Sequence, residues 1–359
     1  MIDLDDLDRL KENDPQDMLA RIAELPQQCR DAWRNIEGFD LPPHYREVDK
    51  VVILGMGGSA IGGDLLRTLV QGECPLPIVV NRDYDVPAFV DGRTLAIASS
   101  YSGDTEETLF AFEGSLKRGA KLLALTTGGK LAERAKEAGV PLLTFSYRSQ
   151  PRAALGHSLI LLVGILQRLG LIADKSADLE EAVAVMEGLQ ARIREAVPLA
   201  RNPAKQLAQK LYGHLPVVYG AGHLSEVAHR WKTQFNENSK AWGFYEVLPE
   251  LNHNAVVGYE FPDDLTGKVV VVMLTSSLDH PRNQVRFQVT QEILARRGVR
   301  YEVVEALGES PLAQVLSTIH LGDYVSYYLA MLYRVNPTSI ETIVYLKERL
   351  ARAAGATHF

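Results

Sequence analysis

Short apolar runs alternate with longer stretches of helical spacing along most of the chain. In the first half, runs rich in Val, Ile, Leu and Ala end in glycine or hydroxyl residues. The segments that follow them repeat apolar side chains every three or four positions. This alternation predicts parallel strands with helices on both faces, which is a doubly wound α/β sheet. The strands are expected at residues 51–54, 77–80, 94–98, 121–125 and 140–145.

The same alternation starts again after residue 200. Further strands are expected at 216–219, 268–274 and 299–304, and two long helices close the chain. The intervening stretch shows helical spacing only, as do the first residues of the chain. We therefore expect two tandem α/β domains. The predicted segments are an N-terminal helical arm (1–45), a first α/β domain (46–152), a helical linker (153–200) and a second α/β domain (201–359).

Composition and charge exclude several classes of function. The 359 residues include 38 Lys and Arg against 45 Asp and Glu, so no basic excess is present to bind nucleic acid or an anionic membrane. The acidic N-terminus lacks the features of a signal peptide, and the apolar run at 158–166 is too short to span a bilayer. Two cysteines, Cys29 and Cys74, cannot form a disulfide framework. We expect a soluble cytoplasmic protein with reduced thiols.

A glycine-rich loop follows the first expected strand. It reads Gly-Met-Gly-Gly-Ser-Ala-Ile-Gly-Gly at 55–63 and leads into a helix. Glycine lets the backbone approach a ligand, and the N–H groups at a helix N-terminus attract anions, so Gly58 and Ser59 are candidate phosphate-binding residues. The loop also fits the dinucleotide pattern G-x-G-x-x-A. A nicotinamide or flavin site, or a plain tight turn, therefore stays open, since residues 81–83 (Asn-Arg-Asp) are ambiguous as a ribose-binding acid.

A second loop, at 99–105, carries four hydroxyl residues before a helix. Three of them, Ser100, Ser102 and Thr105, are candidate phosphate ligands, because a phosphate monoester needs several hydrogen-bond donors. Helix capping is the alternative, but a cap needs only one such residue. No Walker lysine follows at the required spacing, so a nucleoside triphosphate is not indicated.

Together these motifs resemble the sugar isomerase (SIS) fold, and within it the bifunctional phosphoglucose/phosphomannose isomerase family. The resemblance implies two tandem SIS-type doubly wound domains, with parallel sheets flanked by helices, an N-terminal helical arm and C-terminal helices. The motifs that carry it are GMGGSAIGGD (55–64), SSYSGDTEET (99–108), Pro151-Arg152, NENSK (236–240), ELNHN (250–254) and NPTSIETIVYLK (336–347).

The resemblance also implies roles for four side chains. Glu237 is the expected base that moves a proton between C2 and C1, and Arg152 is expected to stabilise the enediolate. His253 and Lys347 are expected to open the sugar ring, with His253 supplied by the partner subunit of a homodimer. Taken from the residues alone, a solvated helix end is as compatible with Glu237, and a structural or solvated position is the commoner one for histidine, arginine and lysine residues such as the other three.

The implied reaction interconverts glucose 6-phosphate, and mannose 6-phosphate as a second aldose, with fructose 6-phosphate through a cis-enediol. Thr338 is a candidate for the small residue that leaves room for the second epimer. We expect neither a metal nor a cofactor, and none of the nine histidines lies in a metal-ligand pattern such as H-E-x-x-H. An amino-sugar phosphate isomerase and a SIS-domain sugar-phosphate-binding regulator are the alternatives.

Overall fold

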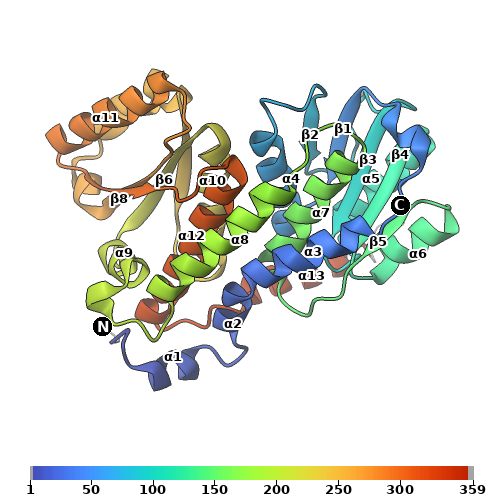
Figure 1. Ribbon diagram of the computed structural model, residues 1–359. Helices are drawn as coiled ribbons and strands as arrows, with labels where there is room; N and C mark the ends of the chain where they lie inside the picture. Colours follow the sequence, from blue (N-terminus) through green and yellow to red (C-terminus); the bar gives the residue numbers. More distant parts are fainter. Residues whose placement is uncertain (1–2, 355–359) are drawn as a thin grey trace.

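The computed structural model describes residues 3–354, and its first half is built on a five-stranded parallel sheet. The strand order is β2-β1-β3-β4-β5 (Figure 1). The strands are β1 (Lys50–Leu54), β2 (Ile78–Asn81), β3 (Thr94–Ser100), β4 (Lys121–Thr126) and β5 (Leu142–Thr144). The helices that alternate with them are α4 (Gly57–Leu69), α5 (Glu106–Lys117) and α6 (Gly129–Glu137). Both central strands, β1 and β3, consist almost wholly of buried residues, as expected for a sheet covered on both faces.

A four-stranded parallel sheet forms the second half, in the order β7-β6-β8-β9. Its strands are β6 (Leu215–Ala221), β7 (Phe244–Leu248), β8 (Val269–Thr275) and β9 (Arg300–Glu305). Its helices include α9 (Pro203–Leu211), α10 (Ser225–Glu237) and α11 (Pro281–Arg296). The sequence pattern did not predict β7. This edge strand is short and half-exposed, and Glu246 interrupts its apolar residues, so it has no continuous apolar run.

Helices from distant parts of the chain pack between and beside the sheets (Figure 1). They are α1 (Leu7–Asn13), α2 (Met18–Ala23), α3 (Leu25–Glu37), α7 (Leu155–Arg168), α8 (Ser176–Ile193) and α12 (Pro311–Tyr333). α3 packs on α7, and α12 packs on α8, α9 and α10. One apolar cluster includes residues of these helices and of both sheets, so the two halves share a core. Among residues 3–354, no helix has the length and apolar character needed to cross a membrane.

The strand order determines where a ligand can bind. In each sheet the second strand of the chain is added on one side of the first strand and the third strand on its other side. This switch in strand order lies between β1 and β3 in the first sheet and between β6 and β8 in the second. In open parallel sheets, ligands bind at such a switch point, beyond the carboxyl ends of the strands. The glycine-rich loop follows β1 and the hydroxyl loop follows β3, so both lie at the switch point of the first sheet.

Candidate active site

The glycine-rich loop lies against the segment that carries Arg152. A Cβ atom on Gly58 would lie 2.8 Å from the carbonyl carbon and oxygen of Pro151, which real Cβ atoms do not tolerate. Only glycine therefore permits this approach. The short 3-10 helix η2 (Pro151–Ala153) is held directly against the start of α4.

The hydroxyl loop is folded around Ser100, which is 2% exposed. Its Oγ donates to Oγ1 of Thr105 at 2.9 Å and accepts from the N–H of Gly103 at 3.1 Å. Ser59 Oγ accepts from the N–H of Tyr101 at 3.1 Å, which joins this loop to the glycine-rich loop. Ser59, Ser100 and Thr105 are thus brought together at the N-termini of α4 and α5.

The capping alternative fits this loop only in part. Thr105 is the residue before α5, yet within residues 3–354 its side chain makes no capping hydrogen bond to that helix. Ser102 is exposed, and its Oγ accepts from the N–H of Asp104 at 3.2 Å, outside the helix. The hydroxyl at the capping position therefore does not occupy the first N–H groups of α5.

Arg152 connects three segments that are distant in sequence. Its side chain is 2% exposed, and burial lowers the pKa of its guanidinium while the carboxylate of Glu237 opposes that shift. Nη1 lies 3.2 Å from Oε2 of Glu237, and Nε donates to Oδ1 of Asn238 at 2.7 Å. Nη2 donates to the carbonyls of Pro337 at 2.6 Å and Thr338 at 3.1 Å. Every nitrogen of the guanidinium is engaged, so its orientation is fixed.

Glu237 is the last residue of α10, and its side chain remains 28% exposed. It lines a cavity of about 610 Å³ between the end of α10 and the segment that follows α12. The other lining residues are Asn236, Lys240, Val335, Asn336, Ser339, Ile340, Glu341, Thr342 and Ile343. A carboxylate that faces a cavity and is paired with a buried arginine can act as a base toward a bound substrate.

Thr338 is also part of this arrangement. It is 8% exposed, and its carbonyl accepts from Arg152. Its hydroxyl oxygen is buried and has no hydrogen-bond partner among the described residues. The structure thus brings together Arg152, Glu237 and Thr338, which the sequence singled out separately.

A buried network behind these residues was not found from the sequence. Arg230 Nη2 donates to the carbonyl of Arg152 at 2.7 Å and pairs with Asp323 at 3.1 Å, both side chains being almost fully buried. Asn238 donates to Oγ of Ser326 at 2.9 Å. Their only sequence signal is the occurrence of charged and amide side chains within apolar helices. Lys240, which lines the cavity, lies within the NENSK motif but was not singled out there.

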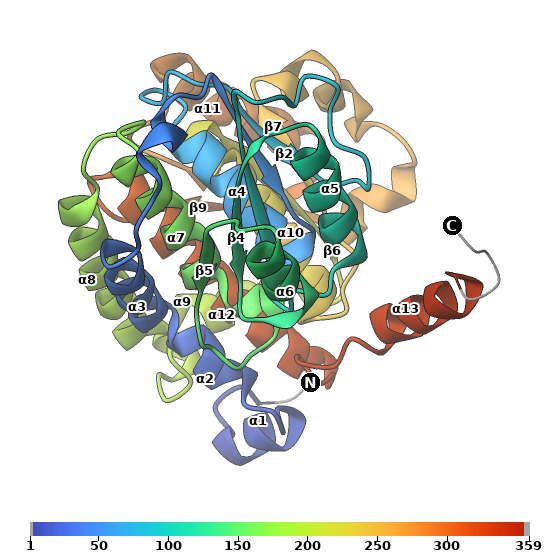
Figure 2. The ribbon, with the colours of Figure 1, turned by 90° about the vertical axis from the view of Figure 1, so that its right-hand side faces the viewer.

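Two predicted residues lie apart from this cluster within one chain. His253 ends the 3-10 helix η5 (Glu250–His253) and is exposed, and no hydrogen bond joins it to Arg152 or Glu237 in the described part of the chain. Lys347 is exposed on α13 (Glu341–Ala354), which extends away from the body of the molecule (Figure 2). Both predictions remain untested by this arrangement.

Three side chains have the spacing of a metal site. Ligand atoms of Asp64, Glu226 and His229 all lie within 4.8 Å of one another. However, Arg82 forms an ion pair with Asp64, and Arg67 pairs with Glu226 at 2.7 Å. Because the guanidinium groups already neutralise both carboxylates, the cluster fits an ion-pair network between α4 and α10 better than a cation site.

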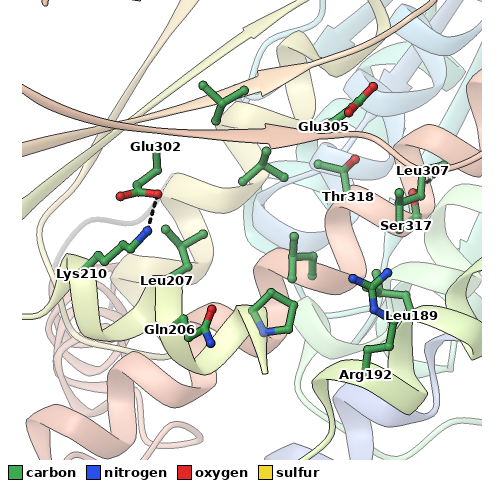
Figure 3. A pocket seen from close by; sticks show the side chains of 14 residues that line it. Leu189, Arg192, Gln206, Leu207, Lys210, Glu302, Glu305, Leu307, Ser317 and Thr318 are labelled. Carbon is green, nitrogen blue, oxygen red and sulfur yellow. Dashed lines mark hydrogen bonds and ion pairs between the residues drawn. The ribbon is translucent and has the colours of Figure 1, made fainter. Parts of the chain in front are cut away.

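A second cavity, of about 280 Å³, lies between α8, α9, β9 and α12. Figure 3 shows Lys210 paired with Glu302, at 2.7 Å, among the side chains that line it. It contains none of the residues that the sequence singled out. The cavity beside Glu237 is therefore the candidate active site.

Comparison with known proteins gives matches over most of the chain. A sequence model described as the bacterial phospho-glucose isomerase C-terminal SIS domain matches residues 200–350. A bifunctional phosphoglucose/phosphomannose isomerase of Caldicellulosiruptor bescii is 45% identical over 337 residues, covering 93% of this chain and 99% of that protein. A protein of the same name from Aquifex aeolicus is 36% identical, covering 90% of this chain and 99% of its own length.

Solved structures confirm the predicted fold class. A hypothetical protein from Thermus thermophilus superposes with a TM-score of 0.73 at 20% identity, covering 97% of this chain and 92% of that one. At this identity the match establishes the fold alone. Together with the SIS-domain match, it confirms two parallel-sheet domains flanked by helices.

Proposed function

The chain belongs to the family of bifunctional phosphoglucose/phosphomannose isomerases, and we propose that it interconverts glucose 6-phosphate and mannose 6-phosphate with fructose 6-phosphate in the cavity beside Glu237. The observation that carries this proposal is that Glu237 lines that cavity and is paired with the buried Arg152. An aldose–ketose isomerisation needs a base beside C1 and C2 and a cation for the developing enediolate, and this pair supplies both.

Glu237 acts as the base in this proposal. Its carboxylate removes the proton from C2 of the open-chain aldose, the C–H electron pair forms the C1=C2 bond, and negative charge moves to O1. A proton then passes from O2 to O1, and the same carboxyl group returns its proton to C1 as the charge at O2 collapses into the ketone. Arg152 stays charged throughout, because a guanidinium does not deprotonate near neutral pH. The chemistry uses side chains alone.

The phosphate group is assigned to the loops at the carboxyl ends of β1 and β3. Gly58, Ser59, Ser100, Ser102 and Thr105 are the proposed ligands, with the N-terminal N–H groups of α4 and α5. The close approach of Gly58 to Pro151 supports this, because it connects the phosphate loops to the segment of Arg152. With the 6-phosphate bound in these loops, C1 and C2 at the other end of the open-chain sugar would extend toward Glu237.

We assign ring opening to His253 of the partner subunit and to Lys347, in a homodimer with composite sites. Within one chain, His253 is exposed, and among residues 3–354 no hydrogen bond or ion pair joins it to Glu237, so a second subunit is needed to complete the site. Large apolar side chains in the same stretch of sequence, residues 242–261, are also exposed: Trp242 by 74%, Val257 by 75% and Phe261 by 76%. A second copy of the chain would cover such a surface.

We propose that Thr338 is the small residue that leaves space for mannose 6-phosphate as a second substrate. Because glucose and mannose 6-phosphate differ only at C2, both give the same enediol once that proton has left. The carbonyl of Thr338 accepts from Arg152, and its hydroxyl has no partner among the described residues, so this small side chain would leave room for an open-chain intermediate to turn about C2–C3. We place this chemistry in the cytoplasm, consistent with an acidic chain that carries its two cysteines as free thiols.

A coupled assay tests the proposal. The purified protein is incubated separately with glucose 6-phosphate and mannose 6-phosphate, and fructose 6-phosphate is measured. We expect turnover of both aldoses without added metal or nucleotide. A protein that binds sugar phosphate without turnover would instead be a regulator, and one that converts only amino-sugar phosphates would contradict the assigned substrates.

A further inference from the structure

Lys240 occupies an unusual position at the end of α10. Its φ of 55° places it in the left-handed region, which lysine rarely adopts, so the surrounding structure must hold it there. In this conformation the ammonium folds back over the helix end. Nζ lies 2.6 Å from the carbonyl oxygen of Glu237, and 3.4 Å from those of Asn238 and Pro337.

The position of Lys240 brings a second cation to the cavity wall. The carbonyl of Pro337 accepts from Arg152 at 2.6 Å as well as from Lys240, so the two cations converge on one oxygen atom. Both Glu237 and Lys240 line the cavity. When Glu237 takes the C2 proton and becomes neutral, two positive groups remain beside the new negative charge.

We propose that Lys240 is a further catalytic residue of the isomerase, donating a hydrogen bond to the enediolate oxygen that Arg152 does not reach. This inference rests on the proposed function, because it takes Glu237 as the base. Of the three carbonyl contacts of the ammonium, only the one to Glu237 is short. One N–H can therefore turn to the substrate without loss of a strong bond. No proton leaves Lys240: the enediolate charge is stabilised at the oxygen and returns to carbon when Glu237 gives its proton to C1.

The charged surroundings of Lys240 give its role a distinct pH signature. Lys240 is exposed at the cavity rim, and partial desolvation together with the nearby guanidinium of Arg152 lowers its pKa to about 8, against the opposing carboxylates of Glu237 and Glu341. These are the charged groups that face it from η2, α10 and α13, and the remaining polar lining residues do not titrate. As pH rises through about 8, the ammonium becomes neutral, so kcat falls on the alkaline side.

The test compares wild type with Lys240→Met and Lys240→Arg across pH 6–10. We expect Lys240→Met to lower kcat about 100-fold with little change in KM, as for the loss of an oxyanion donor. Lys240→Arg should keep much of kcat, and its alkaline fall should disappear, since arginine stays charged. If Lys240 had only a structural role, the alkaline fall of kcat would not depend on its charge and would persist in Lys240→Arg. The control is Lys136→Met, which removes an exposed positive charge on α6.

The outcomes separate the two proposals. If wild type is active and Lys240→Met retains kcat within about twofold of it, with the alkaline fall unchanged, Lys240 has no catalytic part. If wild type and Lys136→Met produce no fructose 6-phosphate, the proposed function itself fails. Circular dichroism verifies folding, and Lys240→Asn replaces Lys240→Met if the latter does not fold, because asparagine tolerates a positive φ.

Discussion

The Nε atom of Arg152 donates a 2.7 Å hydrogen bond to Oδ1 of Asn238, and this bond directs the neighbouring Nη1 toward the carboxylate of Glu237. Asn238 is fully buried and is itself held by Ser326 on α12. The alignment of base and cation therefore depends on a residue that need not touch substrate.

Replacing Asn238 by alanine tests this dependence. Asn238→Ala leaves a buried guanidinium donor without its partner, which should lower the free energy of unfolding by about 1–3 kcal/mol. Because Arg152 can then rotate away from Glu237, kcat should fall about 10- to 100-fold. Urea unfolding and steady-state kinetics measure the two effects. Asn35→Ala, at an exposed hydrogen bond to the carbonyl of Thr144, is the control and should change neither strongly.

The contact between Gly58 and Pro151 predicts a clash in Gly58→Ala. The added Cβ would lie 2.8 Å from the Pro151 carbonyl, so we expect a loss of about 1–3 kcal/mol of stability. Since the phosphate loop would shift from Arg152, KM for glucose 6-phosphate should rise. The matched control is Gly188→Ala on α8, where nothing lies within 4 Å of the new atom. That variant should be more stable by about 0.5–1 kcal/mol, because alanine favours a helix. Equal effects of the two substitutions would contradict the packing argument.

The composite site predicts complementation between two inactive variants. Glu237→Gln and His253→Ala should each be inactive as homodimers. In a mixed dimer, one site combines an intact Glu237 with an intact His253, so random exchange of equal amounts should restore about a quarter of wild-type activity. Activity is followed after subunit exchange, with size-exclusion chromatography to verify the dimer. No recovery in verified mixed dimers would place His253 in the same chain's site, or in none.

Asp279 predicts a pH dependence of stability. Burial raises the pKa of this carboxyl to about 6, and only the N–H of Ser276 opposes the shift. The folded pKa exceeds the usual value of ~3.9, so the protonated form is favoured by folding. The protonated carboxyl of Asp279 therefore stabilises the folded state fully below about pH 4, and this stabilisation is lost as pH rises through about 6.

Asp279→Asn mimics the protonated carboxyl at every pH. The free energy of unfolding of Asp279→Asn should be close to that of wild type at pH 4 and should exceed it by ~3 kcal/mol above pH 7. Thermal and urea unfolding across this range measure the difference. Asp83→Asn, an exposed position, serves as the reference. A pH-independent difference for Asp279→Asn would show that folding does not raise the pKa of this carboxyl.

Much of the fold follows from local sequence pattern. Buried strands such as β3 and β8 are continuous apolar runs, so their places could be predicted within a few residues. The edge strand β7 could not, because pairing with β6 creates it and its own residues alternate in exposure. Local pattern finds elements that bury both faces and misses those that depend on a neighbour.

The candidate site divides in the same way. Arg152 and Glu237 stand in recognisable motifs, but their pairing joins residues 85 positions apart and only the fold shows it. Arg230 and Asp323 support them from within α10 and α12, and a buried ion pair leaves no local signal in a sequence. The position of the Lys240 side chain depends on the left-handed backbone conformation of Lys240 itself. The sequence does not signal this conformation, because the residue is neither glycine nor asparagine.

The central claim is that Glu237 carries the proton between C2 and C1. The direct measurement is the loss of deuterium from C2 of 2-deuterated glucose 6-phosphate and 2-deuterated mannose 6-phosphate, whether it moves to C1 or to solvent, compared between wild type and Glu237→Gln. Wild type should remove the label from both sugars, and Glu237→Gln should do so at least about 1,000-fold more slowly, while still binding substrate. Undiminished loss of the label in a folded Glu237→Gln protein would contradict the account.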